Sequence, residues 1–106
     1  MTANSSRHAR GEYYTPRWLA EFILDEAGYQ GQAGLRLLDP SCGPGVFLVL
    51  AVARARRNGR TAEEILASIH GYELNPESAA VARAAYLAAL GNLAGDLRPA
   101  DVPVCC

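Results

Sequence analysis

The stretch Asp39-Pro40-Ser41-Cys42-Gly43-Pro44-Gly45-Val46-Phe47 decides the fold of this 106-residue chain. It separates the apolar run 35–38 from a second apolar run over 47–53. An apolar run, a turn rich in glycine and proline, and another apolar run are typical of a strand, a tight turn and a helix. We therefore expect a buried strand over 35–38, ended by Asp39, and a helix from about Gly45 to Asn58.

The two glycines of this turn, Gly43 and Gly45, are suited to holding a small charged ligand. Without a Cβ atom they let backbone N–H groups approach a ligand at the N-terminus of the following helix. Two common ligand sites are excluded. A dinucleotide fingerprint needs a third glycine where this chain has Leu48. A phosphate-binding loop needs a lysine, and the sequence contains none.

Helix signals lie on both sides of the turn. Upstream, Thr15 is expected to be an N-cap with Pro16 at the first helical position, and Gly28 ends that helix. Trp18 belongs to the apolar stripe of the same helix, so we expect it in the core. Downstream, the segment 61–64 (Thr-Ala-Glu-Glu) predicts a capping box and a short helix.

A second strand and helix follow. Residues 69–73 are predicted to form a strand ended by Glu73, and Asn75-Pro76 begins a helix that reaches about Leu90. Residues 92–106 contain turn signals and one candidate for extended chain, Val102-Pro103-Val104. The order α-β-α-α-β-α predicts an α/β fold with a parallel sheet. Two strands would leave that sheet incomplete.

Composition limits the class of protein. The length allows one domain at most, and we interpret residues 1–10 as a flexible tail before a domain portion that spans 11–106. The net charge of −1 provides no global positive field for nucleic acid. The arginines at 54, 56, 57 and 60 are better explained as a solvated helix end that complements the helix dipole than as phosphate ligands.

Cysteine usage and hydropathy indicate a cytoplasmic protein without a metal. The three cysteines, Cys42, Cys105 and Cys106, form no C-x-x-C pair, so we expect no metal site. An odd number of cysteines fits a reducing compartment. We also expect no membrane interaction, because no apolar run approaches the length of a membrane span and the first ten residues are polar.

The turn D-P-x-C-G-x-G-x-F resembles the S-adenosylmethionine-binding motif of amino-group DNA methyltransferases, above all the adenine-N6 enzymes of restriction-modification systems. Residues 11–16 (Gly-Glu-Tyr-Tyr-Thr-Pro) and 71–76 (Gly-Tyr-Glu-Leu-Asn-Pro) resemble two further motifs, in family order. The resemblance implies a partial Rossmann-like S-adenosylmethionine-dependent methyltransferase fold with an incomplete sheet. It implies S-adenosyl-L-methionine as the cofactor.

The resemblance also assigns roles to individual residues. It implies that Asp39 binds the methionine ammonium, whereas capping the turn is the alternative. It implies that Glu73 accepts the ribose hydroxyls, whereas interaction with the N-terminus of the next helix is the alternative. Phe47 fits the pocket and the core equally well. The complete implied cofactor-binding set is Tyr14, Thr15, Asp39, Pro40, Cys42, Gly43, Gly45, Phe47, Glu73 and Leu74.

One family segment is missing from this sequence. The family orients the amine of a flipped adenine with an Asn/Asp-Pro-Pro-aromatic segment, whereas Asn75-Pro76 is followed by Glu77 and is explained as a helix start. We therefore expect the cofactor-binding half of an enzyme that binds DNA when complete, its catalytic half being supplied by another chain or segment. Two alternatives stay open: a non-catalytic module that binds S-adenosylmethionine or a nucleotide, and a fragment of a protein or RNA amine methyltransferase.

Overall fold

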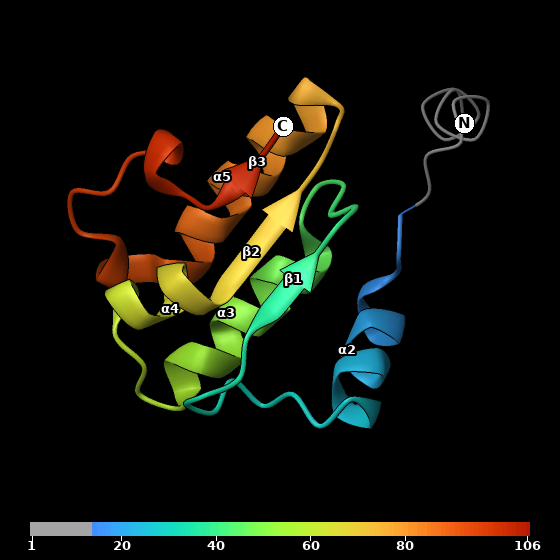
Figure 1. The fold of residues 1–106 in the computed structure, drawn as a ribbon, viewed down its shortest axis with the longest axis vertical. Coiled ribbons are helices and arrows are strands. Elements are labelled where there is room, and N and C mark those ends of the chain that lie inside the picture. Colours follow the sequence, from blue (N-terminus) through green and yellow to red (C-terminus); the bar gives the residue numbers. More distant parts are fainter. Residues whose placement is uncertain (1–13) are drawn as a thin grey trace.

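The computed structural model describes residues 14–106, so the predicted tail over 1–10 and the beginning of the 11–16 motif lie outside the described residues. The elements, in order, are α2 (Arg17–Glu26), β1 (Leu37–Asp39), α3 (Val46–Arg57), α4 (Ala62–Ser68), β2 (Ile69–Tyr72), α5 (Pro76–Leu90), the 3-10 turns η1 (Gly91–Ala94) and η2 (Pro99–Asp101), and β3 (Val104–Cys105) (Figure 1). The predicted alternation of strands and helices is confirmed.

The sheet has three parallel strands in the order β1-β2-β3. Leu38 pairs with His70, and Gly71 pairs with Val104. The third strand, β3, overlaps the predicted candidate for extended chain over 102–104 only at Val104. Because all three strands are parallel, their carboxyl ends lie at the same end of the sheet (Figure 1). Open α/β sheets bind their ligands at this carboxyl end.

Helices α3 and α5 pack side by side behind one face of this sheet (Figure 1). The largest fully buried side chains lie in this layer and in the neighbouring helix α4 and strand β2: Leu48, Val52, Ile65, Ile69, Tyr86 and Leu90. The Tyr86 hydroxyl donates to the carbonyl oxygens of Ile65 and Ile69, at 3.2 and 2.9 Å. This core therefore holds in place the strands and helices that carry the loops at the carboxyl ends of the strands.

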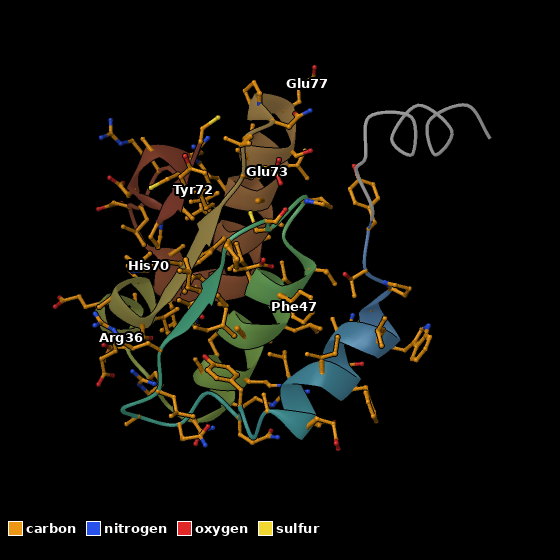
Figure 2. The ribbon with its side chains drawn as sticks, turned by 45° about the vertical axis from the view of Figure 1, so that its right-hand side comes forward. Arg36, Phe47, His70, Tyr72, Glu73 and Glu77 are labelled. Atoms are coloured by element: carbon orange, nitrogen blue, oxygen red, sulfur yellow. The ribbon has the colours of Figure 1, made fainter. Side chains whose placement is uncertain are left out.

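The opposite face of the sheet is exposed in the described part of the chain. Burial alternates along β2, with Ile69 and Gly71 buried and His70 and Tyr72 exposed. Figure 2 shows His70 and Tyr72 extending from this strand. Leu38 of β1 is 67% exposed. The prediction of a buried strand over 35–38 is therefore wrong: β1 begins at Leu37, and the described residues 14–106 place helices against a single face of the sheet.

Helix α2 buries fewer of its apolar side chains than the apolar stripe in its sequence predicted. Ala20 and Leu24 are buried, whereas Trp18 is 69% exposed and Phe22 is also exposed. The prediction that Trp18 belongs to the core is wrong for the described residues. An ion pair fastens α2 to α3: Nη1 of Arg54 lies 2.7 Å from Oδ1 of Asp25.

Two of the three predicted helix caps are confirmed. Thr61 and Glu64 form the reciprocal capping box at α4, and the Asn75 side chain accepts from the Ser78 amide at 3.0 Å to begin α5. The prediction for Thr15 is wrong, because Pro16 occupies the N-cap position of α2 and no side chain caps that helix. Across the described part of the chain, no helix combines the length and apolar character that crossing a membrane requires.

Candidate functional site

The turn between β1 and α3 is held in place by its own backbone and by the end of β2. The Ser41 amide donates to Oδ1 of Asp39 at 3.1 Å, so Asp39 does cap the turn, as its alternative role predicted. The Cys42 amide donates to the Tyr72 carbonyl at 2.9 Å, and the Gly45 amide donates to the Cys42 carbonyl at 2.9 Å. The turn is thus bonded to both neighbouring strands.

The two glycines of the turn do different work. Gly45 has φ +99°, and a Cβ atom there would lie 3.2 Å from Cα and Cβ of Ala82, so it allows α5 to pack against the turn. Gly43 has φ +54°, and a Cβ atom there would lie 3.8 Å from the Tyr14 ring. Gly45 therefore serves helix packing, whereas Gly43 faces open space beside Tyr14.

That open space is a cavity of about 250 Å³. Its lining residues are Tyr14, Thr15, Asp39, Ser41, Cys42, Gly43, Pro44, Val46 and Phe47. Six residues of the implied cofactor-binding set thus meet here, contributed by the segment before α2, the end of β1 and the start of α3. Sequence reasoning left out Ser41, Pro44 and Val46, although their membership of the same turn was a usable signal. Figure 2 shows Phe47 on the side of α3 that faces α2.

The other implied residues lie beside this cavity. Glu73 follows β2, and its carboxylate accepts from the Gly43 amide at 2.8 Å and from the Asn75 amide at 2.9 Å. Leu74, the next residue, is 77% exposed. Pro40 and Gly45 belong to the turn but do not line the cavity.

Electrostatics distinguish the acid and the thiol of this site. Burial raises the pKa of Asp39, and the nearby Glu73 carboxylate raises it further, whereas the Ser41 amide opposes the shift. Burial, helped by the charges of Asp39 and Glu73, raises the pKa of Cys42 to about 11. Cys42 is therefore a neutral, buried thiol at physiological pH and behaves as a small core side chain rather than a nucleophile.

The arginines of α3 and the following loop are not a uniform solvated group. Arg54 is buried and donates to the Tyr29 carbonyl as well as to Asp25. Arg60 donates to the carbonyl oxygens of Gly31 and Gln32. The prediction of a solvated helix end is wrong for these two residues, because Asp25 of α2 and backbone carbonyls of the loop after α2 accept hydrogen bonds from their guanidinium groups.

Metal ligands are not gathered at this site. Within residues 14–106, no group of three or more His, Cys, Asp or Glu side chains is placed to hold a metal ion. The three cysteines are unpaired thiols, Cys42 being buried and the other two exposed.

Comparison with known proteins identifies the family of this chain. The family model described as N-6 DNA Methylase matches residues 1–90. The chain is 36% identical over 66 residues to the type I restriction enzyme MjaIX methylase subunit of Methanocaldococcus jannaschii, and that match covers 62% of this chain and 11% of the relative. It is 34% identical over 87 residues to the adenine-specific methyltransferase PglX of Streptomyces coelicolor, with 65% of this chain and 7% of the relative covered.

A type II enzyme matches over more of the chain. The type II methyltransferase M.PaeR7I of Pseudomonas aeruginosa is 36% identical over 100 residues, and the match covers 85% of this chain and 17% of the relative. The chain thus spans less than a fifth of the length of each of these curated relatives. No solved structure gives a significant match.

Proposed function

Because this chain belongs to the N-6 DNA methylase family, we propose that it forms the S-adenosylmethionine-binding part of a DNA adenine-N6 methyltransferase of a restriction-modification system. The observation that carries the proposal is the cavity of about 250 Å³ at the carboxyl end of β1. The Gly43 amide links that cavity to the acidic residue that follows β2. This bond supports a proposed site that draws on the ends of two neighbouring strands.

We assign the cavity to the methionine part of the cofactor. The Asp39 carboxylate accepts the ligand ammonium, one of its oxygens meanwhile capping the turn. Tyr14 and Thr15 lie beside the ligand carboxylate, next to the N-terminus of α2, where the helix dipole favours negative charge. Phe47 forms the apolar wall next to the sulfonium.

We assign the ribose and adenine of the cofactor to the segment after β2. The Glu73 carboxylate has lone pairs beyond those used by the two backbone amides and accepts the ribose hydroxyls. The exposed Leu74 side chain supplies an apolar surface for the adenine ring. Pro40, Cys42 and Gly45 act less directly, by shaping the turn that carries Gly43.

The reaction we propose for the complete enzyme is direct displacement of the methyl group from a sulfonium by the exocyclic amine of a flipped adenine. When bound, the cofactor supplies the activated methyl group. This chain holds the cofactor, and a further segment must hold the amine in line with it. No Asn/Asp-Pro-Pro-aromatic segment occurs in the 106 residues. We therefore expect the chain by itself not to methylate DNA.

We propose that the exposed face of the sheet, and the edge of β1 that no described strand pairs with, receive the segment or chain that completes the enzyme. An apolar cavity of about 250 Å³ lies along this edge, between α2 and β1, and its lining includes Ile23, Leu37 and Leu38. Exposed apolar surface next to an unpaired strand edge is typical of an interface. DNA is then a partner of the assembled enzyme, in the cytoplasm, rather than of this surface.

Isothermal titration calorimetry of the full chain tests the cofactor assignment. S-adenosylmethionine and S-adenosylhomocysteine are expected to bind with one site per chain, and NAD to bind more weakly than either. Leu48 stands where a dinucleotide site needs glycine, and this is the physical reason for the preference. Tighter binding of NAD would contradict the proposal.

A second experiment tests the division of labour. The purified chain is incubated with labelled S-adenosylmethionine and adenine-rich duplex DNA, alone and with the part of M.PaeR7I that lies outside the matched segment. No incorporation is expected from the chain alone. Methyl transfer by the chain alone, above the level of a Gly43→Val control, would show that catalytic residues lie among those assigned here to the cofactor site or the core.

A further inference from the structure

The Glu73 carboxylate bridges the two loops that follow β1 and β2. Its Oε1 atom accepts from the Gly43 amide at 2.8 Å, and its Oε2 atom accepts from the Asn75 amide at 2.9 Å. Gly43 belongs to the cavity-lining turn, whereas Asn75 caps α5. Figure 2 shows Glu73 beside the turn between β1 and α3. One side chain is thus bonded to both loops of the proposed cofactor site.

The bond to Gly43 constrains the conformation of the turn. Gly43 has φ +54°, a left-handed conformation that glycine adopts without strain, so its own backbone preference does not fix the turn and a bonded partner can. A hydrogen bond from a backbone amide to a carboxylate is among the stronger polar contacts in proteins. It acts together with the bond from the Cys42 amide to the Tyr72 carbonyl, so two adjacent amides are fixed to the end of β2.

This geometry changes what the Gly43 amide does. In a site where glycine amides bind the ligand directly, that N–H group would be directed at the ligand. Here it is directed at Glu73. Gly43 contributes space to the cavity, and Glu73 determines where that space lies. Glu73 is thus bonded to the turn that lines the cavity, although it does not line the cavity itself.

We propose that Glu73 is a positioning residue for the methionine pocket, in addition to accepting the ribose hydroxyls. The proposal rests on the cofactor assignment above. It makes the two halves of the site interdependent, because one carboxylate serves the ribose and holds the turn on which the methionine part rests. Loss of the carboxylate therefore weakens binding even of a ligand that offers no ribose hydroxyl to it.

The test compares two variants of the full chain against two ligands. Glu73→Gln keeps the size of the side chain but replaces one acceptor oxygen with an NH₂ group, which cannot accept from a backbone amide. Glu77→Gln makes the same chemical change on an exposed side chain in the first turn of α5 and serves as the matched control. The ligands are S-adenosylhomocysteine and its 2′,3′-dideoxy analogue, titrated by calorimetry.

Glu73→Gln is expected to bind S-adenosylhomocysteine about tenfold or more weakly than the native chain. It is expected to bind the dideoxy analogue at least about threefold more weakly as well. Glu77→Gln should match the native chain for both ligands. Equal binding of the analogue by Glu73→Gln and the native chain would overturn the positioning role and leave the cofactor assignment intact. Failure of the native chain to bind S-adenosylhomocysteine would instead overturn the cofactor assignment.

A measurement without ligand completes the test. In ¹⁵N–¹H spectra, the Gly43 amide should shift and exchange its proton at least about tenfold faster in Glu73→Gln, because its charged acceptor is lost. The Glu77→Gln spectrum should leave Gly43 unchanged. A Gly43 amide that is unchanged in Glu73→Gln would also overturn the positioning role, whatever the affinities.

Discussion

Replacing each glycine of the turn by alanine should separate the stability of the fold from the binding of the ligand. At Gly45, the new Cβ atom lies 3.2 Å from Cα and Cβ of Ala82, and φ is +99°. Left-handed backbone in an L-residue costs about 1–2 kcal/mol. Forcing a methyl group into a packed contact costs about 1–3 kcal/mol more. The expected loss in the free energy of unfolding for Gly45→Ala is therefore about 2–5 kcal/mol.

Gly43→Ala carries only the first of these costs. Its Cβ atom would lie 3.8 Å from the Tyr14 ring, an ordinary van der Waals distance, so the expected loss is about 1–2 kcal/mol. The same methyl group extends into the cavity that Gly43 and Tyr14 line. Gly43→Ala should therefore be the more stable variant and should still bind S-adenosylhomocysteine more weakly than the native chain.

Urea denaturation followed by circular dichroism at 222 nm measures the difference. With a slope of about 1 kcal/mol/M, the midpoint for Gly45→Ala should fall about 1–3 M below that for Gly43→Ala. An unfolded Gly45→Ala chain beside a folded Gly43→Ala chain agrees with the same reasoning. Equal midpoints for the two variants would refute it, because the contact with Ala82 would then carry no weight.

Three further outcomes are expected. The pKa of Asp39 is raised in the free protein, and a ligand ammonium favours the ionised carboxylate. Affinity for S-adenosylhomocysteine should therefore fall as the pH is lowered through that pKa. In calorimetry, Asp39→Asn should show a weaker dependence of affinity on pH. A thiol reagent at pH 8 should modify Cys105 and Cys106 quickly and spare Cys42 until the chain unfolds, so rapid modification of all three would contradict the buried position of Cys42. Without the segment or chain proposed to cover it, the exposed sheet face should make the isolated chain self-associate. Leu38→Glu should then reduce self-association in sedimentation velocity without changing the far-ultraviolet spectrum, whereas an unchanged association state would contradict the assignment of this face as an interface.

Short-range sequence signals predicted most boundaries of the helices and strands. The capping box at Thr61, the Asn75 cap and the glycine turn after Asp39 are short-range signals, and the structure places a helix or strand boundary at each. The Thr15 cap failed although it is equally local, because Pro16 takes the N-cap position instead. A two-residue strand such as β3 is too short for any periodic signal, so only its extended character could be anticipated.

The remaining discrepancies depend on what lies opposite each side chain. Apolar periodicity indicates which face of an element avoids water, but it does not say whether the described chain covers that face, and Leu38 and Trp18 are exposed for this reason. Arg54 is buried because it donates to Asp25 and to the Tyr29 carbonyl, which precede it by 29 and 25 residues and which no local pattern links to it. The hydrogen bond between Glu73 and Gly43 joins residues 30 apart in the sequence, and the spacing of the motifs did not predict it.

The most direct test of the central claim is a structure of the full chain in complex with S-adenosylhomocysteine. We predict that the homocysteine part occupies the cavity between Tyr14, Asp39 and Phe47. The ribose hydroxyls should lie within hydrogen-bond distance of the Glu73 carboxylate, which should still accept the Gly43 amide. A ligand bound on another surface, or one whose ribose lies away from Glu73 while the cavity stays empty, would contradict the assignment of this chain as the cofactor-binding part of a DNA adenine methyltransferase.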